Sequence, residues 1–324
     1  EGVLLGGIVA LLMLVVRPQG SLRAVITYGI GAALAFLVVL SPYLALNLEL
    51  TGGLLPDTAQ AKFEQFEVLL AQPYPVRLLP LFTSILVGGQ VLLLLGAAFY
   101  LWHIGQRDSF AKMLYWSLPL LWFVALPMLY ASRLPTPYQH GRYLMPILPA
   151  LIVVGTVGMI WLAGAKRRQL LRRVLSRTVI ASSVAAYAVF LFLGATIYRD
   201  DVSIIDNEMV AAAFWIRDNL PDDALLAIHD IGAVGYFAPR PDLLDIAGLV
   251  SPEVIPIVSD GPALWELMEQ QGAVYLMAFP SQIPGRNPDD PRLCEIFNTD
   301  AEITRRFGRG NTAIYRLAYN GDCS

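Results

Sequence analysis

Charged residues are scarce in this chain and absent from long parts of it. Only 15% of its residues are Asp, Glu, Lys or Arg, against roughly 25% in typical soluble domains. Five stretches contain none of these residue types: 24–48, 78–102, 113–132, 143–165 and 178–198. Each is about as long as the ~20 residues that a helix needs to cross a bilayer. The composition therefore argues against an ordinary soluble protein and predicts membrane spans.

Cysteine and histidine are also rare. The three histidines, His103, His140 and His229, lie in different segments, and no His/Cys pattern has zinc-ligand spacing, so we predict no structural metal site. Cys294 and Cys323 are 29 residues apart. In an oxidising compartment they could form a disulfide, or they could remain two free thiols.

Positive charge is concentrated in the segment 165–177, which holds six Lys or Arg residues and no acid. Short cytoplasmic loops collect Lys and Arg, so this segment is predicted to lie inside. The loops 49–77 and 131–142, and everything after Tyr198, then face the outside. We expect a multi-pass integral protein of the plasma (inner) membrane with an extracytoplasmic carboxyl-terminal domain.

Acidic residues divide the chain in two. Residues 1–198 hold six acids and fourteen bases, whereas residues 199–324 hold twenty acids, nine Arg and no Lys. We predict a transmembrane helical domain over 1–198 and an extracytoplasmic α/β domain over 199–324. The short apolar run 3–16, which comes first in the chain, would be a truncated span and brings the number of spans to six. The expected fold is an α-helical polytopic membrane bundle of about six spans, followed by a small α/β domain.

The carboxyl-terminal part has the pattern of a layered domain. Asp206 is predicted to cap a helix that ends near Asn219. Continuous apolar runs then predict strands at 224–228, 243–246 and 274–279, and an alternating pattern predicts another at 312–317. Buried runs of the first kind are typical of a parallel sheet covered by helices.

The outside loop 49–77 contains a helical pattern after Asp57 and Thr58, either of which could cap it. Phe63, Phe66 and Leu70 would share one face of this helix. We expect an amphipathic helix that lies along the outer membrane surface.

Cationic residues gather in the two outside loops. Lys62 lies in the first, and Arg133, His140, Arg142 and Tyr143 lie in or beside the second, which has no acid. The planar guanidinium group matches phosphate oxygens, and Lys adds a point charge, so the pattern predicts a phosphate site. The alternative is that these side chains anchor span ends at the lipid headgroups.

Three polar residues of the carboxyl-terminal part are candidates for a role on the acceptor side. His229 and Asp230 follow a predicted strand and could be acid/base machinery, or they could stabilise a turn. Asp245 lies in an apolar run and needs a partner when buried; Arg240 or His229 could supply it. A structural role for Asp245 is the interpretation we favour. The G-x-G-x-x-G spacing is absent, which argues against a nucleotide site.

A succession of short motifs resembles the carboxyl-terminal half of bacterial polytopic glycosyltransferases of the GT-C superfamily, in particular the protein-mannosyltransferase-like and terminal arabinofuranosyltransferase-like members. The motifs are Val16-Arg17-Pro18-Gln19-Gly20, Ser41-Pro42-Tyr43, Leu55-Pro56-Asp57-Thr58-Ala59-Gln60-Ala61-Lys62, His140-Gly141-Arg142-Tyr143-Leu144-Met145-Pro146, Ala227-Ile228-His229-Asp230-Ile231-Gly232-Ala233 and Leu244-Asp245-Ile246-Ala247-Gly248-Leu249. The resemblance covers nearly the whole chain. Asp57 departs from it, because Asn is expected there.

The resemblance implies transfer of a sugar from a polyprenyl-phosphate donor to an extracytoplasmic glycan, lipid or protein acceptor. It makes Lys62, His140, Arg142 and Tyr143 donor-phosphate contacts. The catalytic carboxylate is expected in an amino-terminal part that this chain does not contain, as is any divalent cation. No other cofactor and no nucleic-acid partner are predicted. The alternatives are a non-enzymatic lipid or glycan transporter, for which spans without ionisable groups argue against ion coupling, and a membrane-anchored glycan-binding protein.

Overall fold

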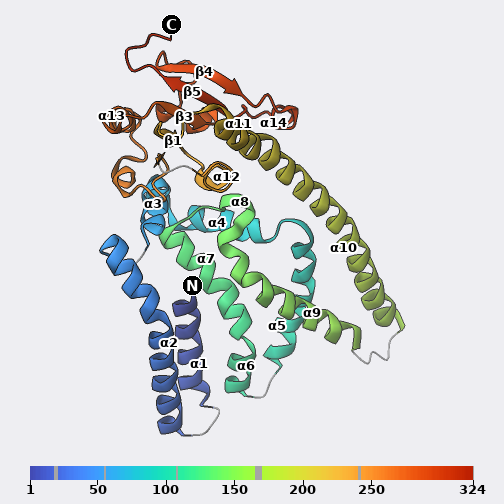
Figure 1. Ribbon diagram of the computed structural model, residues 1–324. Helices are drawn as coiled ribbons and strands as arrows, with labels where there is room; N and C mark the ends of the chain where they lie inside the picture. The colour runs from blue at the N-terminus through green and yellow to red at the C-terminus, as the bar shows by residue number, and fades with distance from the viewer. Residues whose placement is uncertain (18–20, 55, 107–108, 165–169, 240–241, 324) are drawn as a thin grey trace. The chain divides into compact units, whose positions relative to one another are not determined.

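The computed structural model describes residues 1–17, 21–54, 56–106, 109–164, 170–239 and 242–323 (Figure 1). The chain divides into two compact units. The first comprises Glu1–Leu50 and Phe66–Gly194, and the second comprises Thr51–Gln65 and Ala195–Ser324. The second unit thus takes part of the long loop that the sequence analysis assigned to the membrane domain. Five residues named in the sequence analysis lie outside the described residues, namely Pro18, Gln19, Gly20, Leu55 and Arg240, and so do residues 165–169 of the basic segment.

The first unit is helical. Its α-helices are α1 (Gly2–Val16), α2 (Leu22–Thr51), α4 (Tyr74–Ile85), α5 (Leu93–Gly105), α6 (Phe110–Trp116), α7 (Leu118–Arg133), α8 (Tyr138–Gly141), α9 (Leu148–Gly164) and α10 (Leu170–Ile205), the last of which continues beyond Gly194 into the second unit. Short 3-10 segments lie between some of them: η1 (Glu67–Ala71), η2 (Gly88–Leu92) and η3 (Arg142–Ile147).

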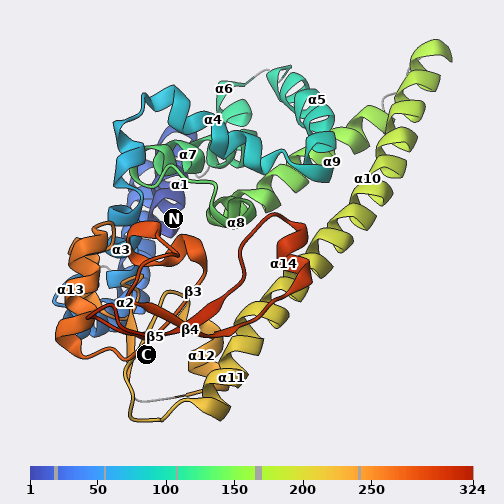
Figure 2. The ribbon, with the colours of Figure 1, turned by 90° about the horizontal axis from the view of Figure 1, so that it is seen from above.

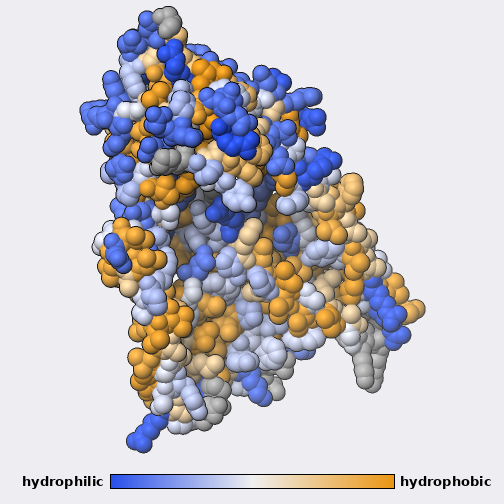
Figure 3. All heavy atoms as spheres, viewed as in Figure 1, coloured by the Kyte–Doolittle hydropathy of each residue, from blue (hydrophilic) through white to orange (hydrophobic). Residues whose placement is uncertain are grey.

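Four helical stretches are long and apolar enough to cross a membrane: Leu22–Thr51, Gly88–Gly105, Gln139–Gly164 and Arg173–Asn219. The pair α6 and α7, bent by 57°, would be a fifth, while α1 is shorter. Large apolar side chains on these helices are exposed, for example Val39 at 80% and Leu191 at 76%. Figure 3 shows such side chains along α2 and α10. The prediction of several helices suited to a membrane is confirmed.

The predicted span 78–102 is not one helix. α4 ends at Ile85 and α5 begins at Leu93, with η2 between them. Gly88 has φ +76°, in the left-handed region that glycine adopts without steric cost. The predicted span 113–132 is likewise broken at Ser117, and Pro119 occupies the first turn of α7, where proline is well tolerated.

Helices α5 and α9 pack unusually closely, because glycines face each other across the contact. A Cβ added at Gly96 would lie 1.9 Å from the carbonyl oxygen of Gly155, and one at Gly158 would lie 1.8 Å from that of Gly96. Such backbone-to-backbone contact is typical of helices that associate within lipid. Beside it, the rings of Tyr100 and Trp161 stack with centroids 5.2 Å apart.

The second unit contains a mixed five-stranded sheet in the order β2-β1-β3-β5-β4. The strands are β1 (Leu226–Ile228), β2 (Leu243–Asp245), β3 (Tyr275–Ala278), β4 (Leu293–Asn298) and β5 (Ala313–Leu317). β1 is parallel to both β2 and β3, whereas β5 is antiparallel to β3 and β4. β4 was not predicted, since this edge strand exposes both Glu295 and Ile296 and has neither a continuous apolar run nor a regular alternation of buried and exposed residues.

Helices cover both faces of this sheet. α13 (Gly261–Gln271) packs on one face through Leu264, Trp265 and Met268, in a core that includes Ala227. α11 (Ala211–Asn219) and α12 (Ile231–Phe237) pack on the other, in a core that includes Ile228. The remaining elements are α3 (Asp57–Gln65), α14 (Glu302–Arg306) and the 3-10 turns η5 (Pro252–Ile257), η6 (Pro280–Gln282) and η7 (Pro284–Arg286). Because Ala227 lies in the first core and Ile228 in the second, successive residues of β1 face opposite layers, as in any strand.

Two predicted helix boundaries are wrong. Asp206 does not start a helix: α10 continues through a π-helical turn, Asp206–Val210, into α11, and Figures 1 and 2 show this long run. No Gly or Pro occurs between Gly194 and Asn219 to interrupt it. The helix after Asp57 ends at Gln65, and Phe66 has φ −114° and ψ 12°. Phe63, Phe66 and Leu70 therefore do not share one helical face.

Candidate functional site

The loop after α7 carries most of the predicted phosphate contacts and has an unusual backbone. Gln139, His140 and Gly141 have φ values of 45°, 58° and 76°. Left-handed backbone is rare for residues other than glycine and costs of order 1–3 kcal/mol for each. Two such residues in succession persist only where the surrounding structure holds them.

Contacts within the first unit hold this loop. Gly141 is buried, and a Cβ there would lie 3.0 Å from the Ser84 hydroxyl oxygen of α4. The next turn is fixed from α7, where the Trp122 indole N–H donates a 3.0 Å hydrogen bond to the carbonyl oxygen of Pro146. Leu144 between them is only 1% exposed. The loop is therefore clamped on both sides of His140 and Arg142.

The cationic side chains of this loop are exposed. Arg142 donates from Nη1 to Oε1 of Gln139 at 2.5 Å, and its guanidinium carbon lies 5.6 Å from the centroid of the Tyr143 ring. Tyr143 stacks in turn on Tyr130, with centroids 5.8 Å apart. Arg133, on the last turn of α7, and His140 are exposed as well. The structure thus brings Arg142 and Tyr143 together and leaves the guanidinium accessible.

Arg77 is a further cation of the first unit, which the sequence analysis treated only as the end of a loop. It lies in α4, and its Nε is buried with no hydrogen-bond partner among the described residues. Its guanidinium carbon is 5.4 Å from the Tyr74 ring centroid, and the Tyr74 hydroxyl donates to the Met128 carbonyl at 2.8 Å. In the sequence, the position of Arg77 directly before the charge-free run 78–102 was the signal available for this residue.

Lys62, the remaining predicted phosphate contact, belongs to the second unit. It lies in α3, is half-buried, and donates a 2.7 Å hydrogen bond to Oε1 of Gln65. Its neighbour Ala61 is 1% exposed, and α3 packs on η5. The five predicted contacts are therefore divided between the two units.

His229 follows the last residue of β1 and is half-buried. Burial lowers the pKa of its imidazole below the ordinary value of 6.5, and the positive charge of Lys62 lowers it further. The carboxylates of Asp245 and Asp230 act in the opposite direction but do not cancel the effect. The imidazole of His229 therefore takes up a proton less readily than a free imidazole.

Asp245 is completely buried, and backbone amides satisfy its carboxylate. The N–H groups of Ala247, Leu249 and Val250 donate to it at 2.9, 2.5 and 2.9 Å. The Asp245 N–H itself donates to the Ser251 hydroxyl at 3.0 Å. Asp245 thus shapes the loop after β2, and no cationic side chain among the described residues pairs with it.

Asp230 has a local role. Its Oδ1 accepts a 3.3 Å hydrogen bond from the Gly232 N–H and so caps α12. No hydrogen bond joins it to His229 in the described part of the chain. This geometry suits the turn-stabilising interpretation of the His229–Asp230 pair.

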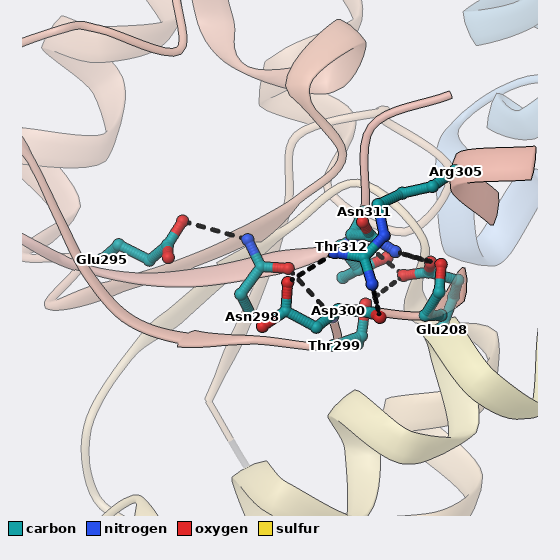
Figure 4. Close-up of polar contacts among 9 residues, drawn as sticks. Glu208, Glu295, Asn298, Thr299, Asp300, Arg305, Asn311 and Thr312 are labelled. Atoms are coloured by element: carbon teal, nitrogen blue, oxygen red, sulfur yellow. Dashed lines mark hydrogen bonds and ion pairs between the residues drawn. The ribbon is translucent and has the colours of Figure 1, made fainter. Parts of the chain in front are cut away.

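Glu208 is a buried acid that the sequence analysis missed. It lies in the π-helical turn with no exposed surface. The Thr299 hydroxyl, the Asn311 amide and the Thr312 N–H donate to its carboxylate at 2.5, 2.7 and 2.7 Å. Figure 4 shows these side chains converging on Glu208 from the segment between β4 and β5. The cluster joins the long helix to the sheet.

Cys294 of β4 and Cys323 form a disulfide with Cα atoms 5.5 Å apart. Across the described ranges, no group of three or more His, Cys, Asp or Glu residues is placed to hold a metal ion.

Comparison with known proteins identifies one similarity. Residues 195–319 match the model of a domain of unknown function, DUF8728, and this match begins where the helical run enters the second unit. No curated protein and no solved structure matches the chain significantly.

Proposed function

We propose that this chain belongs to an integral-membrane glycosyltransferase of the GT-C type. It would transfer a sugar from a polyprenyl-phosphate donor to an extracytoplasmic glycan, lipid or protein acceptor. The observation that carries the proposal is the clamped left-handed segment Gln139–His140–Gly141, which exposes His140 and Arg142 beside α7. Strained backbone clusters at functional sites, where the surrounding fold maintains it.

The chemistry of this segment suits a phosphate. The exposed Arg142 guanidinium contacts Gln139 and Tyr143, and a guanidinium group has the planar donor geometry that matches phosphoryl oxygens. Departure of a polyprenyl phosphate leaves negative charge on the leaving group, and fixed cations stabilise that charge.

In the proposed arrangement the apolar helices lie in the plasma (inner) membrane and the sheet-containing unit lies outside. Among the described residues, Arg173 and Arg177 are exposed near the beginning of α10, on the side that the charge distribution assigns to the cytoplasm. The opposite end of α10 continues into the second unit.

The test is sugar transfer from a labelled polyprenyl-phosphate donor by the full-length protein in membranes. Arg142→Ala should lower kcat/KM by about 10- to 100-fold, because a hydrogen bond to a charged group contributes roughly 1.5–3 kcal/mol. Arg177→Ala, an exposed arginine of α10, serves as the matched control and should retain activity. Normal transfer by Arg142→Ala would contradict the proposed phosphate role.

A further inference from the structure

The loop between α14 and β5 is basic, although the part of the chain that contains it is strongly acidic. Residues 199–324 hold twenty acids against nine Arg. Three of those arginines, Arg305, Arg306 and Arg309, lie within five consecutive residues, and residues 305–310 are all exposed. The loop therefore presents local positive charge on a unit of the opposite overall sign.

Two of these three arginines lack the ion pairs that are common elsewhere in this part of the chain. Four of its arginines pair with an Asp close in the sequence: Arg199, Arg217, Arg292 and Arg305. Among the residues that the structure describes, no carboxylate and no hydrogen-bond acceptor meets the side chain of Arg306 or Arg309. Their charge is therefore not neutralised within the unit.

A phenylalanine lies between these two cations on a fixed turn. The side chain of Phe307 is 50% exposed. The N–H groups of Phe307 and Arg309 donate to the Thr304 carbonyl at 3.1 and 3.2 Å, and that of Gly308 donates to the Arg305 carbonyl at 2.9 Å. Gly308 has φ +68°, the left-handed backbone that commonly ends a helix. Residues 306–309, the basic tip, thus combine two cations and an exposed ring on one turn.

The base of this loop is attached to the long helical run. The segments on both sides of the loop donate three hydrogen bonds to Glu208, as Figure 4 shows. Glu208 comes ten residues after Tyr198, the end of the charge-free stretch 178–198, which corresponds to about 15 Å along a helix. Phe307 is four residues from Asn311, and four extended residues span up to about 13 Å. Lipid headgroups form a layer about 5–8 Å thick, so the basic tip is within reach of it if 178–198 crosses the bilayer.

The combination of groups favours a lipid surface over a soluble anion. A soluble anion would satisfy the two guanidinium groups but leave the Phe307 ring in water. An anionic lipid surface offers phosphates to Arg306 and Arg309 and an apolar layer to the ring between them. The acidic remainder of the unit is repelled by such a surface, so the basic tip is the part that approaches it most favourably.

We propose that the basic tip docks on an anionic lipid surface, with Arg306 and Arg309 at the headgroup phosphates and the Phe307 ring among the upper parts of the lipid chains. The proposal rests on the membrane location that is part of the proposed function, and it is independent of sugar transfer. It assigns to the second unit a lipid contact separate from the helices suited to a membrane.

The test places a single fluorine probe in the tip. Phe307 is replaced by para-fluorophenylalanine, which keeps the ring, and the full chain is inserted into lipid nanodiscs that contain a lipid with a gadolinium-chelating headgroup. The discs consist of phosphatidylcholine alone or of phosphatidylcholine mixed with phosphatidylglycerol. Gadolinium broadens the fluorine NMR signal of a nearby ring, so the signal should broaden strongly in the anionic discs and weakly in the neutral discs.

Variants separate the two cations from general attraction to the disc. Each Arg near an anionic surface contributes a factor of about five. Arg306→Gln combined with Arg309→Gln should therefore lower the ratio of docked to free tip by roughly 25-fold. Arg217→Gln is the control, because Arg217 is also exposed beside a Phe ring but is paired with Asp218, and it should leave the broadening unchanged. The same probe at Phe214, which is 39% exposed, should remain sharp.

Three results overturn the proposal: equal broadening in neutral and anionic discs, full broadening in the double variant, or equal broadening at Phe214. Failure here is distinguishable from failure of the proposed function. Sugar transfer that depends on Arg142, together with a sharp signal at Phe307, would remove the lipid contact and leave the transferase standing. Broadening that requires phosphatidylglycerol, in a protein without transfer activity, would have the opposite meaning.

Discussion

Replacement of Glu208 tests whether the buried carboxylate is what fastens the long helix to the sheet. Glu208→Ala removes the acceptor of three hydrogen bonds and leaves the buried Thr312 N–H and the half-buried Thr299 hydroxyl without it. Asn311 keeps one bond, to the Ala301 carbonyl at 2.9 Å. Each bond to a charged group contributes roughly 1.5–3 kcal/mol, but burial of the carboxylate in the wild type offsets part of the sum. We expect the second unit to lose about 3–5 kcal/mol of stability.

Glu208→Gln keeps the size and shape of the side chain and removes its negative charge, so it isolates the contribution of the charge to stability. The Gln oxygen in the position of Oε2 can still accept from both the Thr312 N–H and the Thr299 hydroxyl, while the NH₂ group takes the position of Oε1, which faces the Asn311 amide. The Asn311 amide is then poorly matched, because it must either face another NH₂ group or turn and give up its bond to Ala301. We expect a loss of about 1–2 kcal/mol, roughly one of the three bonds.

Amide hydrogen exchange of the purified chain measures the loss of local stability at the Thr312 amide, which bonds directly to Glu208. The Thr312 N–H donates directly to Glu208, so a loss of 3 kcal/mol in Glu208→Ala speeds its exchange by about 100-fold if local opening governs the rate. Glu302→Ala, an exposed acid of α14, is the control and should leave exchange at Thr312 unchanged. If exchange at Thr312 and global unfolding are the same in Glu208→Ala as in the wild type, the reasoning about this cluster is refuted.

Two further predictions concern the helix contact and the imidazole. Gly158→Ala should separate α5 from α9, because its Cβ would lie 1.8 Å from the Gly96 carbonyl oxygen. Thermal unfolding in detergent should show a clear loss of stability for this variant. The control Gly164→Ala, whose Cβ would have no neighbouring atom within 4 Å, should show no loss. Since the folded-state pKa of His229 lies below its unfolded value of 6.5, its contribution to stability is complete above pH 6.5 and declines as pH falls towards the folded pKa. The unfolding free energy should therefore decrease less between pH 7 and 5 in His229→Gln than in the wild type; equal decreases would contradict this assignment.

The sequence by itself determined the class of each segment. Runs without charge have to lie where backbone groups bond internally and apolar side chains avoid water, so the helices suited to a membrane were predictable from composition. The short apolar runs of the second part likewise indicated β1, β2 and β3, because a strand covered on both faces contains few polar residues. The alternating pattern at 312–317 indicated β5. Breaks within those segments were harder to predict, since the propensities of Ser117 and Gly88 are weak and packing decides them.

Only the tertiary structure decided which distant residues act together. Helix α3 packs on η5, Glu208 accepts hydrogen bonds from the segment before β5, and the segment 139–141 takes up left-handed backbone through contacts with other helices. None of these has a local signal, because each depends on groups brought together by chain closure over tens to more than a hundred residues. The hydrophobic periodicity of a sequence indicates whether a side chain is buried or exposed. Which residue that side chain contacts depends on how whole helices and strands pack together.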